Sequence, residues 1–197
     1  GIMDIMLILQ IIVLLGAIFL GVRLGGIGIG YAGGAGVLYA RKEAPLAAAS
    51  PAQSAALAKL LALELPDTKG VKQPLAQWKG KVLVVNFWAT WGPPCRKEIP
   101  GFSAMSQKYA DKGVQFVGIS IDTEKNVSNF QAAQKVSYPL VIASPAVVQL
   151  TEELGNASQG LPFTLIIDKN GAISQIKLGA LSEDELDRKL AGLSQPR

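Results

Sequence analysis

The feature that most restricts the fold of this chain is an apolar run, residues 81–88, followed at once by a turn with two prolines and a predicted helix. The run is rich in β-branched and aromatic residues, which is typical of a strand buried on both faces of a sheet. Prolines fit the first turn of a helix because its N–H groups have no intrahelical partner. We therefore predict a buried strand and then a helix that continues through Cys95 to about Asp111, with Gly92 at or beside its N-cap.

The rest of residues 59–197 alternates in the same way. A tight hairpin is predicted at residues 168–171, because its Asn-Gly pair tolerates positive φ angles. Ser182 and Glu185 have the spacing of a capping box that opens the last helix. Further strands are predicted near residues 63–65, 113–121 and 139–142, and further helices at residues 124–136 and 146–154. This alternation predicts an α/β fold.

Three segments resemble the TlpA-like branch of the thioredoxin superfamily: residues 85–91, 93–100 and 160–168. Members of that branch are tethered bacterial thiol-disulfide oxidoreductases that face outside the cytoplasm. The resemblance covers roughly residues 60–195. It implies a thioredoxin-like fold, with a central mixed sheet flanked by helices and a central insertion, preceded here by an apolar membrane segment.

By this resemblance, Gly92 stands where the family carries its first, attacking cysteine, and Cys95 is the second, resolving one. In a Cys-x-x-Cys site the helix N-terminus stabilises the outer thiolate, which attacks a substrate disulfide, and the inner cysteine resolves the mixed disulfide. The chain has one cysteine, so it cannot complete this dithiol cycle. Loss of the attacking cysteine predicts an inactive form rather than a substrate trap.

The resemblance also assigns the other site residues. Glu98 matches an acidic residue of the family that tunes a thiol pKa or relays a proton, while the alternative is a solvated helix residue. Asn86 replaces a buried acid of many cytoplasmic thioredoxins, which leaves proton handling to Glu98. The Leu161–Pro162 bond is expected to be cis and to lie beside the helix N-terminus. The residues expected to bind substrate are Trp91, Pro93, Pro94, Leu161 and Pro162.

Two other functions stay open from the sequence. The first is a redox-inactive binding module that holds extended peptides between Trp91, the helix start and the Pro162 segment. The second is one-cysteine chemistry, with Cys95 as a peroxide- or glutathione-reactive thiol. Against the second, a thiol one turn into a helix is expected to be a small, buried and unreactive core residue.

The N-terminal 43 residues differ in composition from the rest. Residues 5–22 and 24–40 are two apolar stretches, each near the length that crosses a bilayer. We predict a membrane anchor over residues 1–43, with one span or a Gly-rich hairpin of two. A linker follows over 44–58, with a helix possible toward Leu57 and Leu61, and then a domain over 59–197. Residues 14–38 also resemble the start of anaerobic C4-dicarboxylate transporters, which implies a borrowed anchor and not transport.

Local basic residues leave the orientation ambiguous, so the family's habit places the domain on the outer, periplasmic side of a bacterial inner membrane. A cleaved signal is the alternative to an anchor, but the apolar segment is long for one. The expected partners are thiol or disulfide proteins of the cell envelope, with cytochrome c maturation and copper-site assembly proteins as the family's examples.

Composition narrows the chemistry further. The chain has no histidine and one cysteine, which argues against Ser-His or Cys-His catalysis, the commonest zinc sites and thiolate clusters. Its net charge of +4 comes from scattered lysines, a pattern that does not favour nucleic-acid binding. We expect no cofactor and no metal.

Overall fold

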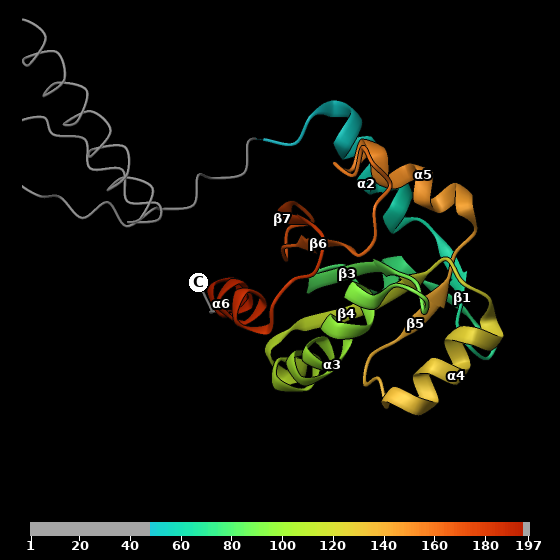
Figure 1. The fold of residues 1–197 in the computed structure, drawn as a ribbon. Coiled ribbons are helices and arrows are strands. Elements are labelled where there is room, and N and C mark those ends of the chain that lie inside the picture. Colours follow the sequence, from blue (N-terminus) through green and yellow to red (C-terminus); the bar gives the residue numbers. More distant parts are fainter. Residues whose placement is uncertain (1–47, 195–197) are drawn as a thin grey trace, which may run out of the picture. The chain divides into compact units, whose positions relative to one another are not determined.

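The computed structural model describes residues 48–194. Its centre is a five-stranded sheet in the order β5-β4-β3-β6-β7 (Figure 1). The strands β3, β4 and β5 run parallel, whereas β6 pairs antiparallel with both β3 and β7. The mixed sheet is therefore confirmed. The strand bounds are β3 Val82–Trp88, β4 Val114–Ser120, β5 Leu140–Ile142, β6 Phe163–Ile167 and β7 Ile173–Leu178.

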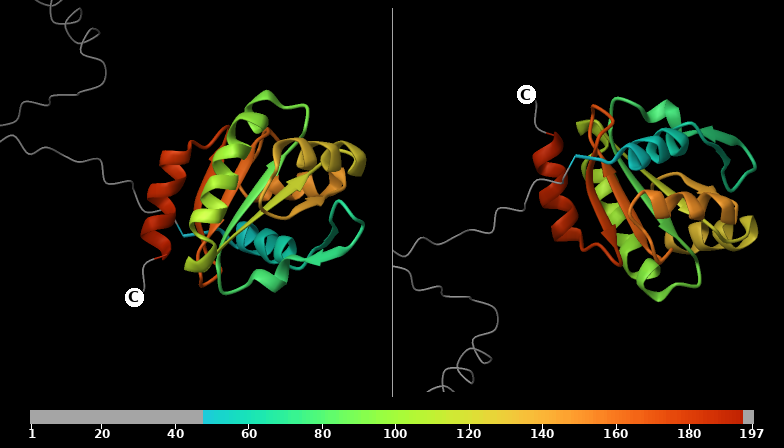
Figure 2. Two further views of the ribbon diagram at one scale, coloured as in Figure 1. Left: turned by 90° about the horizontal axis from the view of Figure 1, so that it is seen from below. Right: turned by 90° about the horizontal axis from the view of Figure 1, so that it is seen from above.

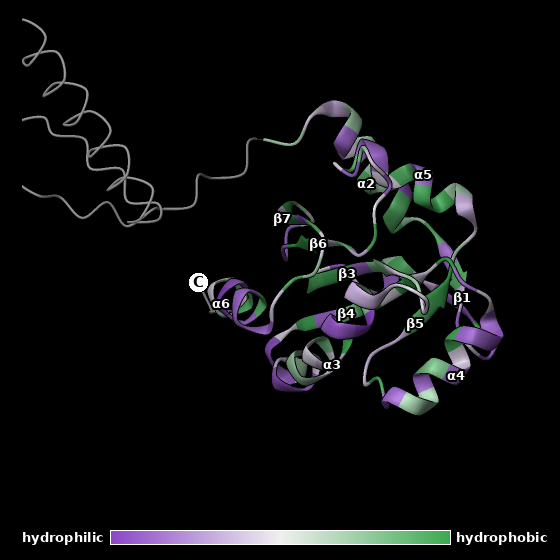
Figure 3. Ribbon diagram, in the orientation of Figure 1, coloured by the Kyte–Doolittle hydropathy of each residue, from purple (hydrophilic) through white to green (hydrophobic). Residues whose placement is uncertain are grey.

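The central strand β3 is buried along its whole length and divides the core into two halves. Leu83, Val85 and Phe87 belong to one apolar cluster, and Val82 and Trp88 to the other, because successive side chains of a strand point to opposite faces. Figure 3 shows hydrophobic residues on the strands and a largely hydrophilic outer helix, α6.

Helices cover both faces of this sheet. The first cluster includes buried residues of α2 (Pro51–Leu61) and α5 (Pro145–Glu153). The second includes residues of α3 (Pro93–Lys108), α4 (Glu124–Gln134) and α6 (Glu183–Ser194). Figure 2 shows this sandwich from both sides, with α3 in front of the sheet from below and α2 in front of it from above.

Within the predicted linker, residues 44–58, the expected helix toward Leu57 and Leu61 is present as α2, and it begins as early as Pro51. The Ser50 side chain accepts a hydrogen bond from the Gln53 N–H at 3.1 Å and caps the helix. Ala56, Leu57 and Leu60 are buried in the core. The folded domain therefore starts before residue 59.

The predicted strand near 63–65 is β1 (Glu64–Pro66), and it pairs with β2 (Lys72–Pro74), which the sequence analysis missed. A short 3₁₀ helix, Leu75–Trp78, leads from β2 to β3. The segment Lys72-Gln73-Pro74 is polar and contains a proline, so it carries no strand signal of its own.

Two local predictions concern turns. The hairpin at 168–171 is confirmed: the Asp168 carboxylate accepts hydrogen bonds from the Asn170 and Ala172 N–H groups, and Gly171 has φ 83°. The capping box is half confirmed. The Ser182 side chain accepts from the Glu185 N–H at 3.3 Å, but the Glu185 carboxylate pairs with Lys177 instead of returning to Ser182.

The two predicted spans, residues 5–22 and 24–40, lie outside the described residues. Among residues 48–194, none of the helices combines the length and the apolar character that a membrane span needs.

Candidate active site

The candidate site lies where β3 passes into α3. Gly92 is the N-cap of α3, as predicted, with extended backbone angles (φ −83°, ψ 113°). Its N–H donates to the Ala89 carbonyl at 3.2 Å, and its own carbonyl accepts from the Arg96 N–H at 3.0 Å. Gly92 is buried, whereas the two prolines that follow it are exposed. Position 92 is thus held by backbone bonds on both sides.

The distances between position 92 and Cys95 match those within a disulfide. A Cβ atom placed on Gly92 would lie 3.6 Å from the Cβ atom and 3.0 Å from the Sγ atom of Cys95. In disulfides the two Cβ atoms are about 3.5–4.5 Å apart, and an S–S bond of about 2.05 Å places each Cβ about 3 Å from the opposite sulfur. The turn therefore holds positions 92 and 95 at the separation of a bonded cysteine pair.

The thiol of Cys95 is fully buried. Burial raises the pKa of Cys95 above its ordinary value, and the charge of Glu98 raises it further, although a backbone hydrogen bond at Ala89 acts in the opposite direction. Such a thiol carries little thiolate at neutral pH and is poorly reactive. These properties agree with the buried-residue interpretation of Cys95 and argue against one-cysteine chemistry.

Glu98 is buried, with 5% of its surface exposed, so the alternative of a solvated helix residue is wrong. One carboxylate oxygen accepts from Asn86 Nδ2 at 2.8 Å and the other from the Leu181 N–H at 2.9 Å. Burial raises the pKa of Glu98 to about 7, although both hydrogen bonds act to lower it. A proton on this carboxyl can therefore exchange near neutral pH.

The hydrogen-bond partners of this carboxyl were not predicted from the sequence. Asn86 Nδ2 also donates to Thr164 Oγ1 at 3.0 Å, and the two residues are register partners of β3 and β6. The pKa of the buried Tyr138 is raised by burial and by the charge of Glu98. Within the described residues, Asn86 Oδ1 and Tyr138 Oη have no hydrogen-bond partner. These groups are far apart in the sequence, and no local sequence pattern connects them.

A second polar group, also missed, fixes the turn before Gly92. The Thr90 hydroxyl donates a short hydrogen bond to Asp122, which follows β4. The other Asp122 oxygen accepts from the Thr123 N–H and from Asn126 Nδ2. Burial alone would raise the pKa of Asp122, but the hydrogen bonds outweigh it and hold that pKa below its usual value. A charged carboxylate therefore ties the turn to the end of the neighbouring strand.

The Leu161–Pro162 bond is cis, as expected. It precedes β6, whose first residue, Phe163, is paired with Phe87 near the end of β3, so the bond lies at the same edge of the sheet as Gly92. Trp91, which is 67% exposed, lies at this edge too. The residues predicted to bind substrate thus come from one edge of the sheet, and their binding roles stay predictions.

Comparison with known proteins identifies the family of this chain. The sequence model of the family described as Redoxin matches residues 47–190. The chain belongs to the redoxin family. Within it, the chain is 31% identical over 130 residues to the thiol-disulfide oxidoreductase ResA of Geobacillus kaustophilus, covering 66% of this chain and 72% of that protein. It is 32% identical over 133 residues to the thioredoxin-like protein YneN of Bacillus subtilis, covering 64% and 73%.

Solved structures of similar proteins have the same fold. A thiol:disulfide interchange protein of the thioredoxin family from Chlorobium tepidum is 31% identical, with a TM-score of 0.62 over 68% of this chain and 93% of that one. A putative thiol:disulfide interchange protein DsbE from the same organism is 26% identical, with a TM-score of 0.59 over the same shares. The domain thus has a thioredoxin-like fold, and its relatives are thiol-disulfide oxidoreductases.

A second family model, described as an anaerobic C4-dicarboxylate membrane transporter, matches residues 6–61 weakly. It overlaps the redoxin match at residues 47–61, and this overlap includes α2, which packs in the redoxin core. Within residues 48–194, no group of three or more potential metal-binding side chains gathers in one place.

Proposed function

We propose that the chain is a membrane-tethered, thiol-disulfide oxidoreductase-type protein of the cell envelope in which Gly92 interrupts the dithiol cycle. The observation that carries this proposal is the spacing at position 92: a Cβ atom there would lie 3.0 Å from Cys95 Sγ and 3.6 Å from Cys95 Cβ. A side chain larger than hydrogen, unless bonded to that sulfur, would crowd it. A preserved disulfide spacing around a glycine fits a site built for two cysteines.

The proposed chemistry needs a thiol at position 92. A thiolate there would attack a disulfide of the substrate, forming a mixed disulfide and releasing one substrate thiolate. Cys95 would then lose its proton and attack the sulfur at position 92, which forms the internal disulfide and releases the second substrate thiolate. Glu98, with its pKa raised to about 7, is the proposed acceptor of the Cys95 proton. With Gly92 the first of these steps is missing.

The proposed location and partners follow from the same reading. The apolar residues 5–40 would hold the chain in the bacterial inner membrane, with the redoxin domain on the outer side. The partners would be envelope proteins that carry disulfides or paired thiols. The names of the relatives as oxidoreductases support the class of chemistry, and the apolar composition of residues 5–40 supports the tether.

The decisive experiment restores the missing thiol. We expect Gly92→Cys to form a 92–95 disulfide on oxidation and to catalyse insulin reduction by dithiothreitol, whereas the unchanged chain does neither. The matched controls are Gly92→Ser, which adds a side chain of similar size without sulfur, and Gly92→Cys with Cys95→Ala, which can attack but not resolve. If Gly92→Cys folds and its two thiols neither pair nor exchange, the proposal is wrong.

A redox-inactive peptide-binding module is the second candidate, and the exposure of Trp91 favours it. A tryptophan 67% exposed at the edge of a site whose only sulfur is buried suits contact with a partner without thiol exchange. This candidate predicts that the unchanged chain binds an extended, cysteine-free peptide and that Trp91→Ala weakens binding several-fold. Fluorescence anisotropy with a labelled peptide measures this, and equal affinity of both proteins would exclude the candidate.

A further inference from the structure

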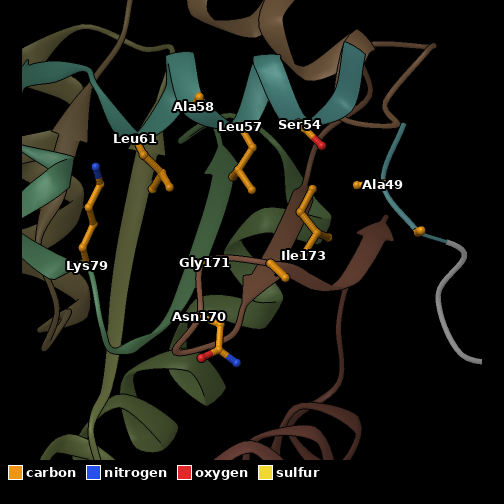
Figure 4. Close-up of a pocket in the computed structure, with 11 residues that line it drawn as sticks. Ala49, Ser54, Leu57, Ala58, Leu61, Lys79, Asn170, Gly171 and Ile173 are labelled. Atoms are coloured by element: carbon orange, nitrogen blue, oxygen red, sulfur yellow. The ribbon is translucent and has the colours of Figure 1, made fainter. Parts of the chain in front are cut away.

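A groove lies between α2 and the β6–β7 hairpin (Figure 4). Its volume is about 580 Å³. One wall is a face of α2, with Ser54, Leu57, Ala58 and Leu61 at helical spacing, and the other includes Ile173 at the start of β7. Most of this lining is apolar, so the groove offers a hydrophobic strip open to solvent.

The rim of the groove is cationic. Lys79 lines the groove, and Lys81 and Lys169 line an adjoining cavity of about 210 Å³. All three side chains are exposed, and none forms an ion pair with another residue of the described range 48–194. The carboxylate of Asp168 in the same lining accepts hydrogen bonds from the Asn170 and Ala172 N–H groups, and the two linings together hold three lysines against this one carboxylate. An apolar strip with a lysine rim fits a molecule that has an acyl part and an anionic head.

The topology places this lysine rim, defined as Lys79, Lys81 and Lys169, at the sheet edge opposite the candidate active site. Lys81 precedes β3, whereas Gly92 follows it, and a strand of this length separates its two ends by about 20 Å. The hairpin that carries Lys169 follows the end of β6 that pairs with Leu83. A surface that covers the rim therefore leaves Trp91 and Gly92 uncovered.

The chain also enters the domain at this groove. Ala48, the first described residue, lines it. Only seven residues, 41–47, separate Ala48 from the second apolar stretch, and with Arg41, Lys42 and Glu43 that connection has a net charge of +1. A bilayer that holds the apolar stretch is thus tied by a short connection to the end of the molecule where the lysine rim lies.

We propose that this groove docks on the bilayer by binding anionic phospholipid, with the lysine rim on the phosphate headgroups and the α2 wall against the upper acyl chains. Each basic residue near an anionic membrane strengthens binding by about fivefold. Docking holds the candidate active site on the side away from the membrane, where soluble partners reach it. This inference rests on the membrane tether in the proposed function, and it does not depend on the redox chemistry.

The test uses the full chain in lipid nanodiscs of two compositions, phosphatidylcholine alone and phosphatidylcholine with phosphatidylglycerol. Flotation first measures the tether. Amine-reactive labelling read by mass spectrometry then measures the exposure of each lysine. We expect labelling of the lysine rim to fall several-fold in the anionic discs, and to recover at high salt. Lys97 and Lys125, at the starts of α3 and α4, are the internal controls and label equally in both.

A charge-matched pair of variants makes the test specific. Lys112 reports on the docked edge, because it adjoins Gly113, where a Cβ atom would lie 4.0 Å from Lys169 Cε. The triple variant Lys79→Gln, Lys81→Gln and Lys169→Gln loses the protection of Lys112 in anionic discs. The control variant carries Lys69→Gln, Lys72→Gln and Lys125→Gln, which remove the same charge from exposed sites elsewhere. In this control Lys112 stays protected from labelling in anionic discs.

Three results would overturn the inference, and they are distinguishable. If the chain does not float with the discs, the membrane tether is wrong and so is the docking, but the proposed redox chemistry is unaffected. A chain that floats but labels equally in both discs has no lipid-specific docking. Protection that is equal in both discs and rises with protein concentration means that a second copy covers the groove instead.

Discussion

At the scale of single residues, the site combines a buried glycine, Gly92, with a buried acid, Glu98. Gly92 leaves the space of a thiol beside Cys95, while Glu98 keeps two hydrogen bonds and a pKa raised to about 7. A buried carboxyl is costly unless it is satisfied or neutral. Its position beside Cys95 fits the role in proton handling that the proposed function gives it.

The pKa of Glu98 predicts how stability depends on pH. Because burial raises the pKa of Glu98 from 4.5 to about 7, the folded state binds this proton more tightly than the unfolded chain does. The free energy of unfolding should therefore be highest below about pH 4.5 for this group and fall, by on the order of 3 kcal/mol, as pH rises to 7. Urea unfolding at pH 5, 6, 7 and 8 measures the slope.

Glu98→Gln should flatten that slope, since the amide does not ionise and can still accept from the Leu181 N–H. Glu124→Gln, at an exposed position, is the control and should keep it. Asp67, Asp122 and Asp187 have lowered pKa values, so they change the free energy of unfolding only at lower pH. A slope that survives in Glu98→Gln would show that another group causes it.

At the scale of elements, the β3–turn–α3 unit was predictable, but its support was not. The apolar run and the two prolines specify strand, N-cap and helix locally. By contrast, the bond from Thr90 to Asp122 joins residues 32 positions apart, and the bond from Asn86 to Thr164 joins residues 78 apart. Such contacts depend on strand order and register, which cannot be predicted from the spacing of apolar residues. The cis bond at Pro162 was predicted only from the resemblance to a family.

The Thr90–Asp122 bond predicts a measurable coupling between the turn and β4. Asp122→Ala should destabilise the fold by about 1–2 kcal/mol, because it removes a charged acceptor from a partly buried hydroxyl and two other donors. A double-mutant cycle with Thr90→Val isolates the direct bond from the remaining contacts. Additive effects of the two changes in urea unfolding would mean that the bond does not hold the turn.

At the scale of the whole molecule, the fold class was predictable, whereas the start of the first helix of the domain was predictable only in part. Residues 44–58 are rich in Ala, Ser and Pro, a composition typical of linkers. Yet α2 places Ala56, Leu57 and Leu60 against the sheet, and Gln53 Nε2 donates to the Leu154 carbonyl at the end of α5. Alanine is frequent in helices as well as in linkers. The helix is favoured here because its apolar residues pack against an otherwise exposed face of the sheet, which the local sequence does not reveal.

The boundary can be tested with one buried leucine. Leu60 is fully buried, so Leu60→Ala should lower the free energy of unfolding by about 2–5 kcal/mol, the cost of a cavity in a packed core. Lys59→Ala changes the exposed neighbour on the same helix and should have little effect. If residues 51–61 were only a linker, both variants would unfold at the urea concentration of the unchanged chain. A large difference between the two makes α2 part of the cooperative domain, and the groove against which we expect lipid to bind then has a rigid wall.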